Sequence, residues 1–236
     1  MIPARLESSR LPNKVLLDIN GKSLLQRVYE RVKKAKKVDD IFIATDNKKI
    51  IDVVESFGGK YILTSTKHKS GTDRIAEAVR NIETDFVINV QGDEPLIDPN
   101  LIDSFVQIFQ NDSEIDFSSA MHKIENLDDL ENPNVVKVVT DLNSDAIYFS
   151  RSPIPFSREK DVSVNNYFQH IGIYAYTKEF LLKYSKLPQT FLEKSEKLEQ
   201  LRAIEYQFKI RMIETDYRSI GVDTFEDLER VRKIIK

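Results

Sequence analysis

The chain has 236 residues, 35 of them basic and 38 acidic, and it contains no cysteine. The lack of cysteine excludes disulfides and thiolate metal sites, and the formal net charge of −3 leaves no overall positive field to hold a nucleic acid. No apolar run approaches the roughly 20 residues that cross a bilayer, and the sequence opens without the apolar core of a signal peptide. We therefore expect a globular protein of the reducing cytoplasm, with no nucleic acid and no membrane insertion among its partners.

The first half of the sequence alternates between helical and strand patterns. Apolar residues three and four positions apart predict helices, whereas short continuous apolar runs predict buried strands. In chain order these are a helix over 23–36, a strand over 41–45, a helix over 50–57, a strand over 61–63, a helix around 75–79 and a strand over 86–91. Strands joined by helices are typical of a parallel sheet covered on both faces, so residues 1 to about 115 predict an α/β fold.

The second half has more polar stretches between its apolar runs. Strands are predicted over 135–139, 146–149 and 171–176, and helices over 197–208 and 225–235. Thr224 followed by Asp227 is a capping-box pattern at the start of the last helix. The polar segment 157–166 predicts an exposed excursion without a domain boundary. We expect one domain over 1–236, made of a nucleotide-binding half at about 1–115 and a second half at about 116–236.

Phosphate-binding motifs built on glycine are absent from the sequence, since it has seven glycines and neither GxxxxGK[ST] nor GxGxxG. A different anion site is suggested by IPARLESSRLPNK, in which Arg5, Arg10 and Lys14 are accompanied by one acid, Glu7. Guanidinium and ammonium groups together suit a polyphosphate without a glycine cradle. The same residues are also compatible with an ordinary solvated loop.

Two acidic residues follow apolar segments far apart in the sequence. Asp93 comes directly after the strand predicted over 86–91, where Gly92 allows a tight exit, and Asp223 lies in the segment GVDT. Carboxylates at the end of a strand suit Mg²⁺, which takes one or two of them together with phosphate oxygens. The alternatives are a turn before Pro95 for Asp93 and helix capping for Asp223.

Two further groups of polar residues are weaker signals on their own. The segment SGTDR, Ser70 to Arg74, stands where a helix begins, so its amides can hold an anion or a base edge, or simply cap the helix. His170, Glu199 and Arg202 lie in segments of mixed polarity. A lone histidine, or a Glu–Arg pair three residues apart, is more often structural than catalytic.

Taken together, these segments resemble one family. In order along the chain stand IPARLESSRLPNK, ATD at 44–46, SGTDR, NVQGDEP at 89–95, NPNVVKVV at 132–139, AIYFSRSPIP at 146–155, HIGIYAY at 170–176, EKLEQLRAIE at 196–205 and GVDTFEDLERV at 221–231. The sequence is similar from end to end to the 3-deoxy-manno-octulosonate (Kdo) cytidylyltransferases. So many motifs in one order make the resemblance highly specific, and it outweighs the structural explanation of each motif taken singly.

The resemblance implies a nucleotidyltransferase of Rossmann-like α/β architecture, with a mostly parallel open sheet flanked by helices and a β-rich insertion. It further implies a cytoplasmic homodimer that converts CTP and Kdo to CMP-Kdo and pyrophosphate for lipopolysaccharide biosynthesis, with Mg²⁺ as cofactor. The matching catalytic positions are Arg5, Arg10, Lys14, Asp93 and Asp223, of which Asp93 and Asp223 are the metal ligands. The matching nucleotide-binding positions are Ala4, Arg5, Arg10, Lys14, Ala44, Asp46, Ser70, Gly71 and Arg74. The matching sugar-acid positions are Gln91, Arg151, His170, Tyr174, Glu199 and Gln200.

On this interpretation the chemistry is mainly electrostatic and positional. The anomeric hydroxyl of Kdo must approach an anionic α-phosphate, and two unit charges about 4 Å apart interact by about 4 kcal/mol at an effective dielectric constant near 20. A metal ion and three basic side chains can outweigh that repulsion, so a dedicated protein base is not required, although His170 stays a candidate for that role. The alternatives are a cytidylyltransferase for an amino-substituted Kdo or a neuraminate, and a non-catalytic nucleotide-binding protein.

The start of the sequence differs from that family. Its members carry several apolar residues before the IPAR motif, which form the first strand, whereas here only Met1 and Ile2 precede Pro3. The first strand of an open doubly wound sheet is usually central, so we expect its neighbours to lose hydrogen bonds and apolar cover. This leads to the hypothesis that the native start lies a few codons upstream, and that the extended protein melts several degrees higher and binds CTP more tightly.

Overall fold

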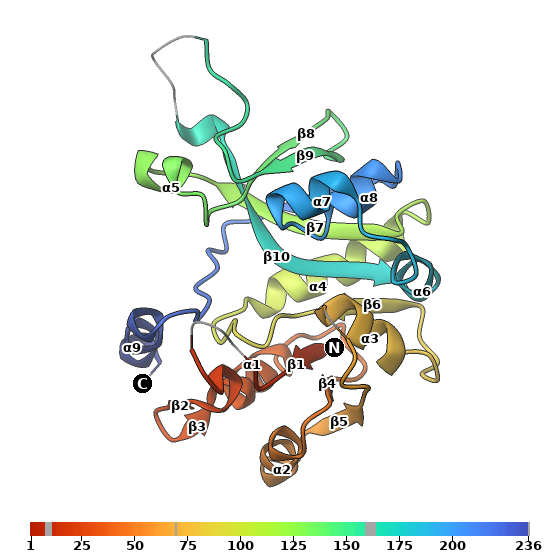
Figure 1. Ribbon diagram of the computed structural model, residues 1–236, viewed down its shortest axis with the longest axis vertical. Coiled ribbons are helices and arrows are strands. Elements are labelled where there is room, and N and C mark those ends of the chain that lie inside the picture. Colours follow the sequence, from red (N-terminus) through yellow and green to blue (C-terminus); the bar gives the residue numbers. More distant parts are fainter. Residues whose placement is uncertain (8–10, 69, 159–163, 236) are drawn as a thin grey trace. The chain divides into compact units, whose positions relative to one another are not determined.

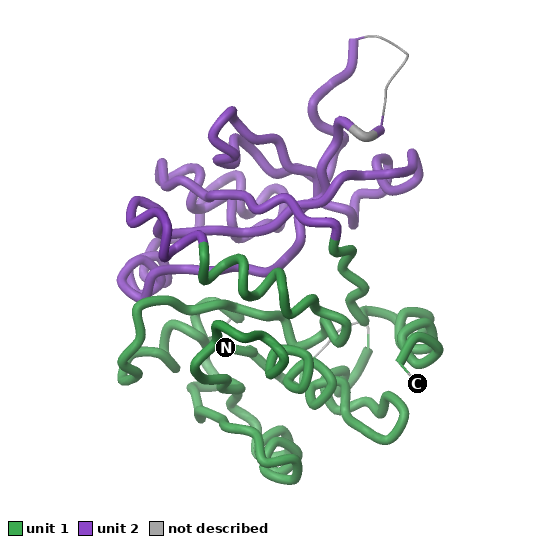
Figure 2. The backbone as a smooth tube through the Cα atoms, turned by 180° about the vertical axis from the view of Figure 1, so that it is seen from behind, with its two compact units in different colours: residues 1–107, 217–236 green, residues 108–216 purple. Residues whose placement is uncertain are grey.

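The structure is a computed structural model that describes residues 1–7, 11–68, 70–158 and 164–235 (Figure 1). It consists of two compact units, which Figure 2 shows in different colours. Unit 1 comprises residues 1–107 and 217–236, and unit 2 comprises residues 108–216. The division differs from the two halves expected from the sequence, because the C-terminal segment returns to unit 1. No described helix is long and apolar enough to pass through a lipid bilayer.

Unit 1 is built on a parallel sheet, as the first half of the sequence predicts. Its strands β1 (Ile2–Ala4), β4 (Phe42–Thr45) and β5 (Lys60–Leu63) are hydrogen-bonded in the order β1-β4-β5. The register sets Ile2 opposite Ile43 and Ile43 opposite Tyr61. Ile2 and Ile43 are fully buried, so the pairing of β1 with β4 forms part of the hydrophobic core.

Local capping defines where the helices of unit 1 begin. Helices α1 (Leu24–Val32), α2 (Lys48–Ser56) and α3 (Gly71–Ala78) follow Ser23, Asn47 and Ser70. Each capping side chain accepts a hydrogen bond from a backbone N–H of the first turn, which has no partner inside the helix. One face of each helix is buried, as the apolar spacing predicts.

The first strand, β1, consists of three residues and has backbone partners on both sides. The backbone nitrogen of Met1 donates to the carbonyl of Ile88 over 2.8 Å, and the nitrogen of Val90 donates to the carbonyl of Met1 over 3.0 Å. These bonds connect the chain ahead of β1 to the region of strand β6 (Phe86–Asn89). The segment therefore has backbone partners in both β4 and the β6 region, and Ile2 is fully buried.

The C-terminal segment completes unit 1. Strand β2 (Asp18–Ile19), which pairs with β3 (Lys22–Ser23), shares one core cluster with α1, helix α9 (Phe225–Ile234) and the segment before α9. Its buried members are Ile19, Leu24, Val222, Leu228 and Val231. The capping box predicted at Thr224 and Asp227 is confirmed, because the Thr224 hydroxyl accepts from the Asp227 N–H and the Asp227 carboxylate accepts from the Thr224 N–H.

Unit 2 contains a mixed sheet with the strand order β11-β7-β10-β8-β9. The strands are β7 (Phe117–Lys123), β8 (Lys137–Thr140), β9 (Ala146–Ser150), β10 (Phe168–Thr177) and β11 (Arg211–Glu214). β11 is parallel to β7, and the other neighbours are antiparallel. The register of β10 against β7 shifts between Ile171 and Tyr174, which is a β-bulge. The α/β class with an added β-rich region is thereby confirmed.

The single helix predicted over 197–208 is wrong. The chain forms α7 (Phe191–Glu196) and α8 (Leu201–Glu205) instead, separated by Lys197 in the left-handed region at φ 56°. This break lets Arg202 reach back to the buried carboxylate of Glu193, with N–O distances of 2.6 and 2.8 Å. Further elements that the sequence patterns did not predict are α4 (Pro99–Asn111), α5 (Leu127–Glu131), α6 (Lys178–Tyr184) and the short 3₁₀ helix η2 (Val164–Asn166).

A fully buried lysine joins two loops of unit 2. Lys137 Nζ donates to the backbone carbonyls of Asn132 at 3.0 Å, Val135 at 2.6 Å and Arg151 at 2.7 Å. Three acceptors match the three N–H donors of an ammonium group. Burial lowers the pKa of Lys137 from its ordinary value. The contacts tie the residues before β8 to the residue that follows β9, which is Arg151.

Candidate active site

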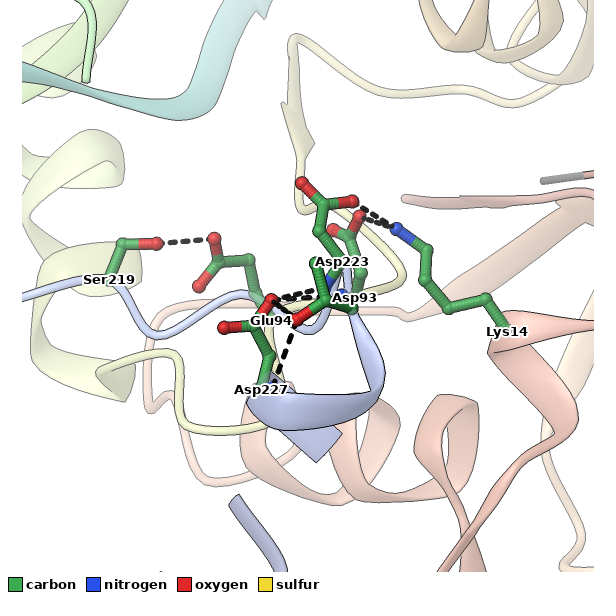
Figure 3. Close-up of polar contacts among 7 residues, drawn as sticks. Lys14, Asp93, Glu94, Ser219, Asp223 and Asp227 are labelled. Atoms are coloured by element: carbon green, nitrogen blue, oxygen red, sulfur yellow. Dashed lines mark hydrogen bonds and ion pairs between the residues drawn. The ribbon is translucent and has the colours of Figure 1, made fainter. Parts of the chain in front are cut away.

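A lysine and two aspartates from distant parts of the sequence meet in unit 1 (Figure 3). Lys14, the first residue of the 3₁₀ helix η1 (Lys14–Leu16), places its ammonium 2.5 Å from Asp93 Oδ2 and 2.9 Å from Asp223 Oδ1. Burial disfavours the ammonium, but the two carboxylates outweigh this effect and raise the pKa of Lys14. Three of the five residues predicted to be catalytic therefore lie together.

Backbone contacts hold the two aspartates at this position. The N–H of Val222 donates to the carbonyl of Asp93 over 2.9 Å, which joins the loop after β6 to the segment before α9. At Gly221, a Cβ atom would lie 3.2 Å from Glu94 Oε1, and at Gly92 it would lie 3.1 Å from the backbone oxygen of Pro3. Both positions permit a close approach of the backbone that a larger residue would disturb.

Glu94, the second acidic residue after the strand predicted over 86–91, is a further functional candidate. Its carboxyl group accepts hydrogen bonds from the hydroxyls of Tyr217, at 3.2 Å, and Ser219. Burial raises the pKa of Glu94 to about 7, with the charge of Asp93 adding to the effect and the two hydroxyls opposing it. These contacts form a second connection between the loop after β6 and the segment before α9. Neither Tyr217 nor Ser219 stands in a motif that spacing could have identified.

The donor set around Lys14 fits a hard divalent cation. Asp93 and Asp223 converge on one positive group, and carboxylate oxygens are the ligands that Mg²⁺ prefers. Within the described ranges, no cluster of three or more His, Asp or Glu side chains with metal-binding geometry occurs. Two carboxylates are sufficient for Mg²⁺ when a substrate supplies phosphate oxygens, so the residues present fit this ion.

Six of the predicted nucleotide-binding residues lie near the ends of β1 and β4 in unit 1: Ala4, Ala44, Asp46, Ser70, Gly71 and Arg74. Arg74 is buried, and its guanidinium donates to Asp46 Oδ2 and to Thr64 Oγ1, each over 2.7 Å. Ser70 caps α3, and a Cβ at Gly71 would lie 3.2 Å from Pro3 Cγ, one residue before Ala4. Ala44, in β4, pairs with Pro3.

The remaining predicted residues of unit 1 are placed as follows. Arg5 follows β1 and is exposed, whereas Arg10 lies outside the described residues. Gln91, predicted to bind the sugar acid, donates through Nε2 to Asn89 Oδ1 over 3.2 Å. Thr64 was not predicted to belong to the site, because a threonine after a strand has no distinctive sequence signal.

The other predicted sugar-acid residues lie in unit 2. His170, Tyr174 and Gln200 are in contact through hydrogen bonds: Tyr174 Oη donates to Gln200 Oε1 at 3.3 Å, and Gln200 Nε2 lies 3.4 Å from His170 Nδ1. Burial lowers the pKa of His170 to about 3. Burial also raises the pKa of Tyr174, with the charge of Glu199 as a second cause. The backbone oxygen of Glu199 accepts from the Tyr184 hydroxyl at 2.7 Å.

Arg151, the last of the predicted sugar-acid residues, is held by backbone oxygens. Its Nε donates to the carbonyl of Glu196 at 2.7 Å and its Nη1 to the carbonyl of Pro133 at 2.9 Å. Its own backbone N–H donates to the carboxylate of Glu196 at 3.0 Å. These contacts fix the orientation of a guanidinium group, which is the side chain best suited to pair with a carboxylate.

Comparison with known proteins shows which family this chain resembles. The sequence model of a family described as cytidylyltransferase matches residues 1–211. A 3-deoxy-manno-octulosonate cytidylyltransferase of Flavobacterium johnsoniae is 49% identical, with 100% of this chain and 97% of that protein covered, and one of Trichlorobacter lovleyi is 46% identical with the same coverage. The structure of a CMP:2-keto-3-deoxy-manno-octonic acid synthetase complexed with CTP matches with a TM-score of 0.94 and 42% identity, over 99% of this chain and 96% of that one.

Proposed function

The chain belongs to the family of 3-deoxy-manno-octulosonate cytidylyltransferases, and we propose on this basis that it transfers CMP from CTP to Kdo with release of pyrophosphate. The observation that carries the proposal is the convergence of Lys14, Asp93 and Asp223 on one point, within a chain that matches such enzymes over its full length. In this reaction the anomeric oxygen of Kdo forms a bond to the α-phosphorus. The bond from that phosphorus to the bridging oxygen breaks, pyrophosphate leaves with the electron pair, and the hydroxyl proton is released.

We propose Mg²⁺ as the cofactor, held by Asp93 and Asp223. When bound, Mg²⁺ supplies Lewis-acid stabilisation of phosphoryl charge and lowers the pKa of a coordinated hydroxyl. The protein's own contribution begins with Lys14, whose ammonium now contacts both carboxylates. We propose that Lys14, Arg5 and Arg10 pair with the triphosphate of bound CTP, because basic side chains are suited to its anionic oxygens.

The two substrates call for different groups. For the cytidine part of CTP we propose Ala4, Ala44, Asp46, Ser70, Gly71 and Arg74. For Kdo we propose Gln91, Arg151, His170, Tyr174, Glu199 and Gln200. Arg151 supports this division, because its guanidinium is held in place by two carbonyls and a sugar acid carries a carboxylate for it to pair with.

The test is a coupled assay of pyrophosphate release. The proposal expects release that depends on CTP, on Kdo and on Mg²⁺, with much lower rates for UTP. A higher kcat/KM for an amino-substituted Kdo or for a neuraminate would reassign the sugar. Binding of CTP without any release of pyrophosphate, for all the sugar acids, would instead support a non-catalytic nucleotide-binding protein.

We further propose a homodimer that acts in the cytoplasm, in lipopolysaccharide biosynthesis. Ten large apolar side chains are exposed among the described residues, and the six that lie in unit 2 are the candidates that we propose for the interface. They are Leu127, Leu142, Ile147, Phe156, Phe191 and Tyr206. Light scattering should give twice the chain mass, and Ile147→Asp should lower it if β9 contributes to the interface. A monomeric mass for the unaltered protein would contradict the dimer.

A further inference from the structure

Four side chains of unit 2 form a continuous hydrogen-bonded series. Ser119 Oγ lies 2.8 Å from His170 Nε2, His170 Nδ1 lies 3.4 Å from Gln200 Nε2, and Gln200 Oε1 lies 3.3 Å from Tyr174 Oη. Ser119 is fully buried, and His170 and Gln200 are nearly so. A polar series in such surroundings must satisfy each donor and acceptor internally, so the position of each proton follows from its neighbours.

The direction of the series is set at Ser119. The bulge in β10 brings the carbonyl oxygens of Ile173 and Ile171 to within 2.8 and 3.3 Å of Ser119 Oγ. A carbonyl oxygen can only accept a hydrogen bond, and a serine hydroxyl has one proton to donate. The proton of Ser119 therefore points to the bulge, and toward His170 the hydroxyl oxygen can act only as an acceptor.

The remaining protons follow in order. Because Ser119 accepts, His170 Nε2 carries a hydrogen, and in a neutral imidazole Nδ1 is then an acceptor. Gln200 must direct its NH₂ group toward Nδ1, which leaves Oε1 facing Tyr174. The Tyr174 hydroxyl donates its proton to that oxygen. Each of the three contacts is consistent with this order, and protonation of Nδ1 would oppose two hydrogen-bond donors.

Aromatic packing holds the imidazole in the orientation that the series requires. The ring of Phe149 meets that of His170 edge to face, with a centroid distance of 4.9 Å and an interplanar angle of 74°. The ring of Tyr174 lies on His170 at 5.5 Å. These contacts oppose rotation of the imidazole.

We propose that Ser119 is a positioning residue that keeps His170 neutral with its proton on Nε2, and that it thereby fixes the Gln200 amide and the Tyr174 hydroxyl for binding a sugar acid. Both nitrogens of His170 are occupied within the protein, so His170 contributes to the Kdo site through Gln200 and Tyr174 and is not the base that accepts the proton of the attacking hydroxyl. Tyr174 has directed its proton inward and presents only lone pairs, so it accepts from a hydroxyl of the ligand. The inference rests on the proposed function in that the ligand is Kdo.

The proton order can be measured without substrate. The chain has three histidines, and a His68→Gln/His122→Gln protein labelled with nitrogen-15 leaves only the signals of His170. We expect a pyrrole-type signal for Nε2, a pyridine-type signal for Nδ1, and no titration of either across the neutral pH range. A proton on Nδ1, or titration near neutral pH, would overturn the proposal. This spectrum decides the proton order whatever the substrate is, so failure of the proposed reaction is distinguishable from failure of the inference.

Kinetics test the positioning role. We expect Ser119→Ala to raise the KM for Kdo roughly tenfold, the effect of losing about one good hydrogen bond, while the KM for CTP stays within about twofold. Ser119→Thr keeps the hydroxyl and should restore most of the affinity for Kdo and the nitrogen-15 spectrum. The matched control is Ser118→Ala, which loses a buried hydroxyl–carbonyl bond of 2.7 Å to Arg211 on the adjacent position of β7. The positioning role of Ser119 would be overturned if Ser119→Ala changed the KM for CTP as much as the KM for Kdo. It would also be overturned if Ser118→Ala had the same KM for Kdo as Ser119→Ala.

Discussion

Lys14 Nζ lies 2.5 Å from a carboxylate oxygen of Asp93, although 79 residues separate the two in the chain. The same ammonium also contacts Asp223, so a single positive charge faces two carboxylates. A divalent cation at this site would have to take over these carboxylates from Lys14. The binding of metal and the release of Lys14 toward a phosphate are therefore expected to occur together.

Removing either acid should abolish turnover. We expect Asp93→Asn and Asp223→Asn each to lower kcat by roughly 100-fold or more, because each removes a carboxylate ligand of the cation that would stabilise phosphoryl charge. The double variant should lose little more than either single variant, since both act through one ion. Pyrophosphate release at limiting Mg²⁺ measures this, with melting temperature as the check on folding. Activity near that of the unaltered protein in either variant would contradict the assignment.

Removing Lys14 should make the stability of the protein depend on Mg²⁺. In Lys14→Met the two carboxylates lose their counter-charge, so we expect a lower melting temperature without metal and a larger rise on adding Mg²⁺ than in the unaltered protein. The measurement is a thermal scan with and without Mg²⁺. Lys22→Met is the control, because Lys22 pairs with Glu30 at a far more exposed position. An identical response to Mg²⁺ in Lys14→Met and in the unaltered protein would count against a shared cation site.

The two substrates should be separable by arginine substitutions. We expect Arg5→Ala to raise the KM for CTP and Arg151→Ala to raise the KM for Kdo, each roughly tenfold or more, the effect of losing a hydrogen bond to a charged group. Arg151→Lys is the control, because it keeps the positive charge but loses the guanidinium contacts to the carbonyls of Glu196 and Pro133. Steady-state kinetics with each substrate varied in turn gives the answer. Equal effects on both KM values in both variants would reject the division.

Arg74 should be intolerant of lysine. Its guanidinium contacts Thr64 and Asp46 at once, and an ammonium group cannot reproduce this planar geometry. We expect Arg74→Lys to raise the KM for CTP several-fold and to lower the melting temperature by several degrees, with the KM for Kdo little changed. Arg80→Lys, an exposed position just after the same helix, is the control. Normal CTP kinetics in Arg74→Lys would exclude a role of this cluster in nucleotide binding.

The buried pair of Glu193 and Arg202 should make stability fall in acid. Burial opposes ionisation of Glu193, but Arg202 and the neighbouring donors outweigh it, so the pKa of Glu193 lies below its ordinary value. A carboxylate with a lowered pKa stabilises the fold above the unfolded pKa of about 4.3, and this stabilisation is lost as the pH falls through the lower, folded value. At neutral pH we expect Glu193→Gln to cost roughly 3–5 kcal/mol, as for other broken buried pairs.

Urea unfolding of Glu193→Gln and of the unaltered protein at several pH values tests this. The difference in free energy of unfolding should shrink as the pH is lowered below about 4. Asp52→Asn is the control, because it breaks an exposed pair with Lys48. A difference that does not change with pH would show that packing, and not ionisation, accounts for the loss.

Local signals explain which parts of the fold were predictable. The capping box at Thr224 and Asp227 is formed by residues close in sequence, and the structure has it where the pattern predicts. The single helix predicted over 197–208 does not form, because Lys197 adopts a left-handed conformation there. The break is accompanied by a contact between separate helices, the pair of Arg202 and Glu193. Periodicity contains no information about such a break.

The candidate site shows the same division. Basic and acidic residues in distinctive motifs could be identified from the sequence, but the contact of one lysine with two aspartates depends on long-range packing. Ser119 had no signal at all, since it is an uncharged residue in a strand. Its importance comes from the bulge in the neighbouring strand, which brings two carbonyl oxygens to its hydroxyl.

Lys137 has a practical consequence beyond its contacts with Asn132, Val135 and Arg151. Its three carbonyl partners surround the ammonium much as oxygen ligands surround an alkali ion, but this cation is covalently tethered and cannot be lost by dilution or dialysis. Acylating reagents should modify the many exposed lysines first and reach Lys137 only when the strands around it open. The rate of acylation of Lys137, measured by peptide mass spectrometry, should therefore report how often the sheet of unit 2 opens locally under native conditions.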